Sequence, residues 1–471
     1  MKKFITMLLC AILLLAPALA LANSGPVYIH GTPGLEMTVQ KNSGISVLHE
    51  YLTINIDHYD IALYTADYRM KNSGEAKEVP MAFPLVSRPS DLFEQRPVIT
   101  CDSKILDYAV YFTKEVKASN SSPPDYKSIG EASFDELLAL LDLDLGNKAA
   151  AYFASLSGYV YSLDLSQFEG SFDVITEASH GAERILILGH PMNHLSHAAD
   201  ESTSFGVSID EGGYHGYDVF TFFLSGEKLD IAASIEPYGV GSENKDIIAA
   251  PYAFQSQSAL TYLLSIFEER FFSYSPALYD ALSALYLEHL HDIAPDQKFL
   301  LVDDEISWLN YNERLAFLVY TVPFEAGQER NVSVQYSALG TSDYTMNEPQ
   351  YHYTYISSPA KSWDSFGGLD ITLKLPERAP HVIASTVELK PSADNSLIMT
   401  AGLDALPEEN ISFTLSSSQT LTKKVNTYAV FFYGILLVIA LVIIAIVVII
   451  LLLVRRSRRK KAARSEDGRL A

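Results

Sequence analysis

The sequence predicts an α+β protein: a mostly antiparallel β-sandwich ectodomain, interrupted by a mixed α/β insertion with a helical hairpin and followed by one C-terminal transmembrane helix. Three observations support this prediction. Apolar and polar residues alternate through residues 45–113, which is the period of a strand. Apolar residues take helical spacing in residues 256–272 and again from residue 276 to Pro295. Residues 428–454 contain no charged side chain.

The composition excludes several classes of protein. The chain has 471 residues, of which 48% are apolar and 19% are charged, so it can bury a large core. Global disorder, a collagen-like fibre and a small disulfide-stapled scaffold are therefore excluded. Lys and Arg number 34 against 57 Asp and Glu, for a net charge of −23. Because such a surface repels phosphate backbones, we expect no nucleic-acid partner.

The N-terminus predicts a secretory signal peptide over residues 1–22. Two lysines precede an apolar stretch, Phe4–Leu15, and the small residues of Ala20-Leu21-Ala22 form a cleavage site. The mature chain is expected to begin near Asn23.

Cys101 is the one cysteine left in the exported part, so no intrachain disulfide can form there. The exported part must then rely on hydrophobic burial. We expect a buried, inert thiol, with an intermolecular disulfide as the alternative.

Residues 428–454 predict a membrane anchor. As a helix these 27 residues are about 40 Å long, enough to cross a hydrocarbon core of about 30 Å. Aromatic residues at one end and basic residues at the other predict an N-terminus outside the cell membrane and a short cytoplasmic tail. The basic cluster serves as a stop-transfer signal and also suits anionic membrane lipid. The predicted anchor residues are Tyr428, Phe431, Phe432, Tyr433, Arg455, Arg456, Arg458, Arg459, Lys460 and Lys461.

The predicted organisation follows from these changes of pattern. Ser133 and Glu136 form a capping box, which predicts the start of a short helix in the insertion. Several strands return after residue 298. The expected segments are a signal peptide (1–22), an N-terminal β domain (23–117), a mixed α/β region with helices (118–297), a C-terminal β-sandwich region (298–390), a last strand and stalk (391–427), the transmembrane helix (428–454) and a basic cytoplasmic tail (455–471).

Several sequence segments resemble those of a protein family. Tyr320–Glu329, Val332–Tyr336 and Trp363–Leu369 resemble sandwich segments of uncharacterised secreted or membrane-anchored bacterial surface proteins of the Gram-positive type. Tyr68–Phe83 is similar to the N-terminal hairpin of those proteins. The resemblance covers about a third of the chain and implies a β-sandwich ectodomain, with no activity attached to it.

The candidate metal site is a histidine-rich stretch. Three imidazoles within eight residues, followed by two carboxylates, offer the nitrogen and oxygen ligands that Zn²⁺ prefers. The alternative is a polar loop whose histidines titrate near pH ~6.5. The candidate ligands are His190, His194, His197, Asp200 and Glu201.

Two acidic runs are candidate calcium sites. Asp142–Asn147 resembles half of a calcium loop, but no Glu follows at the twelfth position. Asp303–Glu305 is a second run. For both, a solvated turn is the simpler interpretation.

Three functions remain open at this point. The favoured one is a non-catalytic, single-pass surface protein that binds a protein or envelope partner or acts as a scaffold. A second is a metal-dependent surface hydrolase that uses the histidine-rich stretch. A third is a receptor-like sensor, which would need a membrane partner because the tail of 17 residues is too short for a catalytic domain.

Overall fold

The computed structural model covers the whole chain and describes most of it. The described residues are 24–30, 36–58, 61–113, 133–168, 170–179, 186–190, 194–197, 202–209, 218–237, 247–271, 273–295 and 299–423, with five isolated positions between 435 and 449.

The described chain is mostly β-structure, arranged in five sheets with few helices, which confirms the predicted fold class at that level. Most strand pairs are antiparallel, as predicted. Among the described strands, parallel pairing joins β3 (Ile45–His58) to β23 (Ser365–Phe366) and β24 (Leu369–Lys374), and β11 (Ile187–His190) to β18 (Phe299–Leu301).

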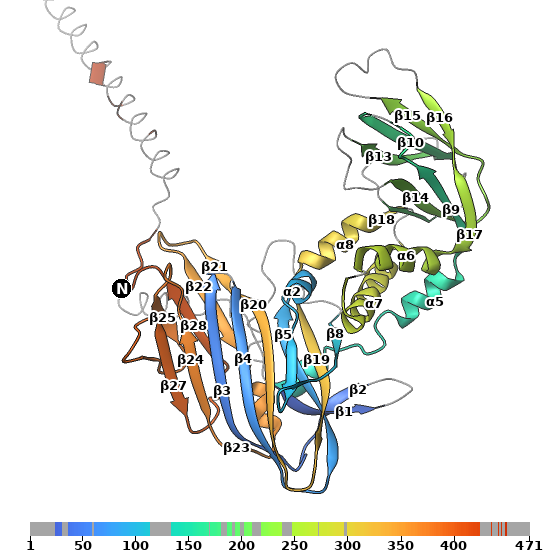
Figure 1. Cartoon of the computed structure of the whole chain (residues 1–471). Coiled ribbons are helices and arrows are strands. Elements are labelled where there is room, and N and C mark those ends of the chain that lie inside the picture. The colour runs from blue at the N-terminus through green and yellow to red at the C-terminus, as the bar shows by residue number, and fades with distance from the viewer. Residues whose placement is uncertain are drawn as a thin grey trace, which may run out of the picture. The chain divides into compact units, whose positions relative to one another are not determined.

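The largest sheet has nine strands, and β3 and β4 (Ile61–Asn72) lie at its centre (Figure 1). Alternate residues of β4 are buried, as the strand period predicts. On one side β4 pairs with β20 (Glu329–Leu339) over eleven residues. The full order is β26 (Lys390–Pro391), β27 (Ile398–Leu403), β24, β3, β4, β20, β6 (Val98–Cys101) and β7 (Lys104–Ile105), with β23 beside β3.

Two further sheets complete the main core. One has β5 (Lys77–Ser87) and β19 (Arg314–Phe324) at its centre, and both strands are buried on both faces along much of their length. Its order is β2 (Glu36–Val39), β1 (Gly25–His30), β5, β19 and β8 (Tyr108–Phe112). The other is β21 (Thr341–Asp343), β22 (Gln350–Tyr355), β28 (Ile411–Ser416) and β25 (His381–Ser385).

Strands from the predicted N-terminal and C-terminal β regions are paired with each other in these sheets. β5 pairs with β19, β4 pairs with β20 and β3 pairs with β24. Each of these pairs joins residues 23–117 to residues 298–390. Three described strands, β26, β27 and β28, occupy residues 390–416, where the sequence pattern predicts one last strand.

A chain of buried hydroxyl groups crosses this core. Tyr355 donates to Glu50 Oε1 at 2.5 Å, and its hydroxyl lies 3.1 Å from that of Tyr68. Glu50 has no exposed surface. Desolvation raises the pKa of Tyr68 and Tyr355 well above the ordinary value, and the nearby Glu50 raises it further. We call Glu50, Tyr68 and Tyr355 the tyrosine network.

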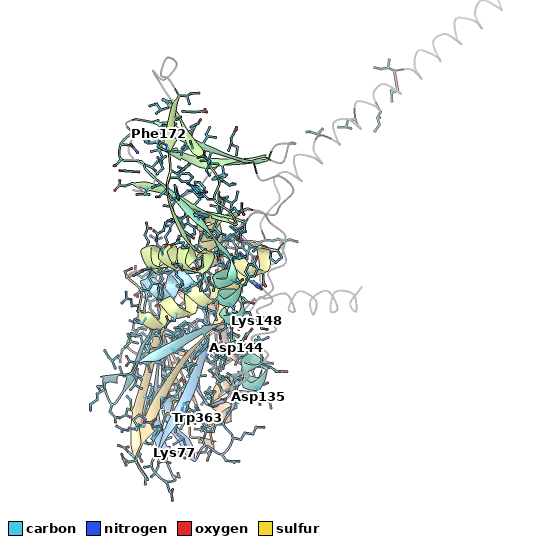
Figure 2. The ribbon with its side chains drawn as sticks, turned by 90° about the vertical axis from the view of Figure 1, so that its right-hand side faces the viewer. Lys77, Asp135, Asp144, Lys148, Phe172 and Trp363 are labelled. Carbon is cyan, nitrogen blue, oxygen red and sulfur yellow. The ribbon has the colours of Figure 1, made fainter. Side chains whose placement is uncertain are left out.

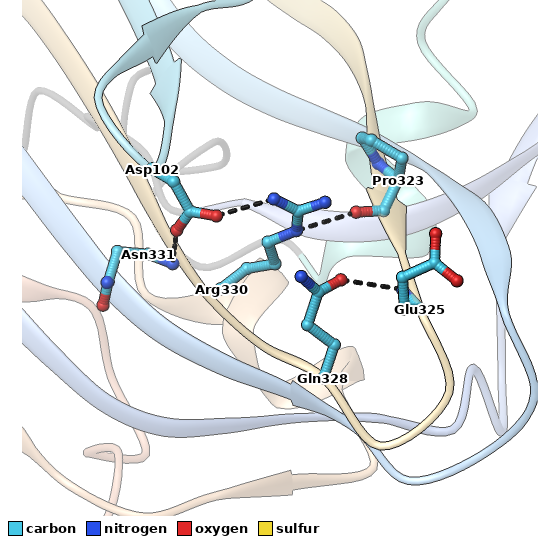
Figure 3. Close-up of polar contacts among 6 residues, drawn as sticks. All are labelled: Asp102, Pro323, Glu325, Gln328, Arg330 and Asn331. Carbon is cyan, nitrogen blue, oxygen red and sulfur yellow. Dashed lines mark hydrogen bonds and ion pairs between the residues drawn. The ribbon is translucent and has the colours of Figure 1, made fainter.

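Asp102, in the β6–β7 turn at the edge of the largest sheet, forms hydrogen bonds to the β19–β20 hairpin (Figure 3). Asp102 accepts from Arg330 Nη1 at 2.7 Å and from the Asn331 amide at 2.9 Å. Arg330 Nε also donates to the Pro323 carbonyl at 3.1 Å. These bonds connect the β6–β7 turn to the β19–β20 hairpin. Asp102 has φ 48°, a left-handed conformation that Asp tolerates better than most residues.

Three of the helices agree with the sequence pattern. α4 (Phe134–Leu138) begins at the predicted capping box, and Ser133 Oγ accepts from the Glu136 amide at 3.3 Å. α6 (Ala259–Phe271) and α7 (Pro276–Ile293) form the predicted hairpin, and Ser275 caps α7. The remaining described helices are α2 (Pro89–Glu94), α5 (Asn147–Ser155), α8 (Val302–Tyr311) and the 3-10 helix η1 (Ser358–Ser362).

The acidic run Asp303–Glu305 was predicted to be a solvated turn, and that prediction is wrong. These residues form the first turn of α8, which begins directly after β18. Acidic residues stabilise the N-terminal turn of a helix because they complement its dipole. Ile306 and Leu309 face the core from the same helix.

The insertion contains a second, smaller core between two five-stranded sheets. We call these sheets the two-sheet module, which comprises residues 157–258 and the strand β18. Aromatic rings make up much of this core. The Phe222 ring stacks on Tyr161 with ring centroids 5.1 Å apart, and it meets Phe205 edge-on with ring centroids 4.8 Å apart. One sheet is β12 (His194–His197), β13 (Ser202–Ile209), β10 (Phe172–Ser179), β15 (Ala232–Pro237) and β16 (Ile248–Pro251). The other is β17 (Ala253–Ser258), β9 (Ser157–Asp164), β14 (Val219–Ser225), β11 and β18.

By their contacts, the described residues up to Asp343 and Gln350–Gln419 belong to one compact unit, and Tyr344–Pro349 belongs with residues 420–423 to another. In the second unit, Thr422 donates to Glu348 through its amide at 2.7 Å and its hydroxyl at 2.9 Å. These bonds lower the pKa of Glu348.

The predicted transmembrane segment 428–454 and tail 455–471 lie outside the described residues, apart from the five isolated positions. So do the predicted signal peptide (1–22) and residues 114–132. Within the described part of the chain, no helix has both the length and the hydropathy needed to cross a bilayer.

Candidate functional site: an apolar edge of the two-sheet module

The structure places the histidine-rich stretch across both sheets of the two-sheet module. His190 ends β11 in one sheet, is only 3% exposed, and has Nε2 3.8 Å from Glu269 Oε2 on α6. His194 and His197 belong to β12 in the other sheet. Asp200 and Glu201 lie outside the described residues, so the zinc site stays a prediction. No cluster of three His, Cys, Asp or Glu side chains suited to a metal occurs among the described residues.

The calcium candidate Asp142–Asn147 forms the turn that leads into α5. Asp142 Oδ1 accepts from the Asp144 amide at 3.0 Å, and Asp144 Oδ1 accepts from Asn147 Nδ2 at 3.2 Å. Figure 2 shows Asp144 close to Lys148 where α5 begins. These contacts agree with a hydrogen-bonded turn, the simpler interpretation of the sequence.

A cavity of about 230 Å³ lies beside this turn. Its walls are residues 109–112 of β8, small residues of α7 and the turn itself, and Asp142 and Asp280 contribute its carboxyl groups. Both carboxyl side chains are solvent-exposed, and the rest of the wall is largely apolar.

A half-buried cluster joins α7 to α8. His289 Nε2 is 2.5 Å from Glu305 Oε2, and the imidazole stacks on Trp308 with ring centroids 5.3 Å apart. Trp308 is 52% exposed. His289 is thus a satisfied histidine at the edge of the core, as its place on the apolar face of α7 predicts.

Cys101 is buried, and burial raises the pKa of its thiol. A raised pKa disfavours the reactive thiolate, which agrees with the inert thiol predicted from the sequence.

The most exposed apolar surface of the two-sheet module follows residues 247–254. Ile247, Ile248 and Phe254 are 63%, 49% and 50% exposed. Ile247 and Ile248 lie at the start of β16, the end strand of one sheet, and Phe254 lies near the start of β17, the end strand of the other (Figure 1). We call these three residues the apolar edge.

Tyr252 fixes the apolar edge in place. Its ring packs edge-on against Phe222 at 5.1 Å, and its hydroxyl is hydrogen-bonded to Thr176. Desolvation raises the pKa of Tyr252, since the ring enters the core. Ile248 and Phe254 lie at even spacing from this buried anchor and are nevertheless exposed, so the chain does not keep a strict strand alternation between β16 and β17.

The strand β17 is exposed along most of its length. Ala253, Phe254, Gln255 and Ser256 are all exposed, and β17 has a paired neighbour on one side only, β9, among the described strands. Lys228 Nζ lies 3.4 Å from the centroid of the Phe254 ring, which holds the ring in a defined position. Alternation did not reveal this edge in the sequence, because residues 256–258 were predicted to begin the following helix, which the structure begins at Ala259.

Comparisons with known proteins leave the family open. No protein-family model matches this sequence, and no curated protein matches it. Among solved structures, it is similar to a crystal structure of a proposed nutrient-binding protein from Legionella pneumophila. That match has 9% identity and a TM-score of 0.30, and it covers 85% of this chain and 72% of the other. A similarity this low assigns neither fold nor function.

Proposed function

We propose that the protein is a single-pass, membrane-anchored extracytoplasmic protein that binds another protein through the apolar edge of its ectodomain. In this proposal the described sheets form a β-sandwich ectodomain outside the cell membrane, residues 428–454 cross the bilayer, and the tail contacts anionic lipid. The sequence of 428–461 supports the anchor, because an uncharged apolar stretch is followed at once by six basic residues.

The apolar edge is the observation that carries the binding function. An end strand presents backbone donors and acceptors to which an extended segment of a partner can add. Proteins commonly protect such strands with Lys, Pro or a covering loop. Pro251 protects the end of β16, whereas β17 has no proline and carries the exposed Phe254. We infer that the partner supplies an extended apolar segment that pairs with β17.

The topology is tested by treating intact cells with protease. Digestion of the ectodomain with survival of a short membrane fragment is expected. Full protection of the chain in intact cells, or its recovery from the cytosol, would contradict the anchor.

The binding site is tested by photo-crosslinking in intact cells. A photoreactive phenylalanine analogue replaces Phe254 in the full chain, and a matched control carries it at Ile105, which is 78% exposed in β7. A distinct crosslinked protein from position 254, lost when Ser256 is replaced by Pro, is expected because proline interrupts strand addition. Equal products from positions 254 and 105 would refute the site, and a product of two copies of this chain would identify self-association instead.

A further inference from the structure

Ser24, close to the predicted cleavage site, is a core residue. It is 2% exposed, its hydroxyl lies 2.6 Å from the Tyr320 hydroxyl, and its carbonyl accepts from Trp363 Nε1 at 3.0 Å. Its backbone also hydrogen-bonds Tyr68 of the tyrosine network. The residues that hold Ser24 are 296 and 339 positions away along the chain.

The next residue, Gly25, is packed against a helix. A Cβ at Gly25 would lie 2.3 Å from Cε1 of Phe134, so the ring of α4 packs directly on the glycine backbone. In the strand register, Gly25 is opposite Ala82 and Pro26 is opposite Met81 of β5. We call Tyr320, Trp363 and Phe134 the seat of the N-terminal segment.

The predicted signal peptide restricts where Ser24 can be before cleavage. The apolar stretch Phe4–Leu15 ends nine residues before Ser24, and nine extended residues reach about 30 Å. As long as the signal is attached, Ser24 is tethered within that distance of the bilayer. Tyr320 and Trp363 emerge much later in export, so the seat does not exist when the N-terminus first crosses the membrane.

We propose that removal of the signal peptide is a folding step. The segment that begins at Ser24 acts as an intramolecular ligand of the seat. It docks there only after cleavage of the signal peptide has released it from the membrane. The ligand is a short peptide. The Trp363 indole N–H binds the Ser24 carbonyl, the Tyr320 phenol binds the Ser24 hydroxyl, and the Phe134 ring packs on Gly25. This proposal uses the predicted export of the chain and is independent of binding at the apolar edge.

The test is disulfide trapping in the full chain in its membrane. Pro26→Cys and Met81→Cys introduce a cross-strand pair, because directly opposite residues of antiparallel strands have Cα atoms about 4.5–5.5 Å apart, within the range of a disulfide. Lys71→Cys and Glu329→Cys form the matched control, an opposite and exposed pair on β4 and β20. Ala20→Phe with Ala22→Phe blocks processing by removing the small residues of the cleavage site.

In the processed chain both cysteine pairs are expected to crosslink on oxidation. In the unprocessed chain the 26–81 disulfide is expected to fall at least fivefold and the 71–329 disulfide to stay the same. In a processed chain, Trp363→Phe is expected to reduce the 26–81 disulfide several-fold, because the donor to Ser24 is lost.

Equal 26–81 crosslinking with and without processing would overturn the proposal. Loss of both disulfides in the unprocessed chain would overturn it as well, since the whole fold would then depend on processing. Failure of crosslinking from position 254 would contradict the partner site and leave this result unaffected.

Discussion

Replacing Tyr355 by Phe is expected to destabilise the protein strongly, although it removes a single oxygen atom. The Tyr355 hydroxyl connects the two other members of the tyrosine network, Glu50 and Tyr68. Without it, the fully buried Glu50 carboxyl loses a donor at 2.5 Å and the Tyr68 hydroxyl loses a partner at 3.1 Å.

The magnitude follows from these two bonds. A hydrogen bond to a charged group contributes about 1.5–3 kcal/mol, and a neutral one contributes about 1 kcal/mol. Tyr355→Phe is therefore expected to lower the free energy of unfolding by about 2–4 kcal/mol. The ring itself is retained, so the loss of packing is small.

Tyr64→Phe is the matched control. Tyr64 is fully buried, its ring centroid is 6.4 Å from that of Tyr355, and its hydroxyl has no hydrogen-bond partner among the described residues. Removing a buried hydroxyl without a partner is expected to change the free energy of unfolding by less than about 1 kcal/mol, in the stabilising direction.

The assay is urea unfolding of the fragment 23–425, followed by tyrosine fluorescence and circular dichroism. Tyr355→Phe is expected to lower the urea midpoint of unfolding, and Tyr64→Phe is expected to raise it by a smaller amount. If Tyr355→Phe and Tyr64→Phe destabilise equally, the buried hydroxyl chain does not stabilise the fold and the reasoning is refuted.

Three further predictions use the same unfolding assay. Hydrogen bonds from the Asn331 amide and from Arg330 lower the pKa of Asp102, so its contribution is full above the ordinary Asp pKa of about 3.9 and is lost as pH falls through the lower folded-state value. Asp102→Asn is expected to cost about 0.5–1 kcal/mol at pH 7, because the pair is partly exposed, and nothing in strong acid. Burial lowers the pKa of His352, so stability should decline as pH falls below about 6.5, and His352→Gln should flatten that decline. Gly25→Ala is expected to cost about 1–3 kcal/mol through overpacking, and Phe134→Leu in the same chain should recover part of that loss.

Each of these predictions has a contradicting result. A pH-independent cost of Asp102→Asn would show that charge is not involved. An unchanged pH profile in His352→Gln would assign the acid sensitivity elsewhere. Additive costs of the two substitutions at Gly25 and Phe134 would show that the glycine and the ring are not coupled.

Local signals allowed part of this fold to be predicted. The capping box at Ser133 and the Ser-Pro start of α7 act within four residues, so the sequence alone locates both helix starts. α5 and α8 were not predicted because neither has a side-chain cap: α5 begins after Gly146 in a left-handed conformation, and α8 begins directly after Leu301 of β18.

Long-range pairing could not be predicted from the sequence. Glu50 has the same alternation phase as the buried Leu52 and Ile54 of β3, but its carboxyl group is typical of a surface residue. Its burial is matched by a hydrogen bond from Tyr355, 305 residues away, which the sequence does not reveal. The apolar edge was missed for a related reason. Its importance depends on β16 and β17 being end strands, which is a property of the completed sheets.

The parallel pair of β3 and β24 has a consequence for biogenesis. Leu52 lies opposite Ile371, so one edge of β3 has no pairing strand until a segment more than 300 residues downstream has been synthesised. At a synthesis rate of ~5–20 residues per second, a chain exported as it is made leaves that side unpaired for about 15–60 s. The export that we propose would accordingly require a holdase on the outer side of the membrane, and depletion of such a chaperone should produce aggregates seeded by residues 45–58.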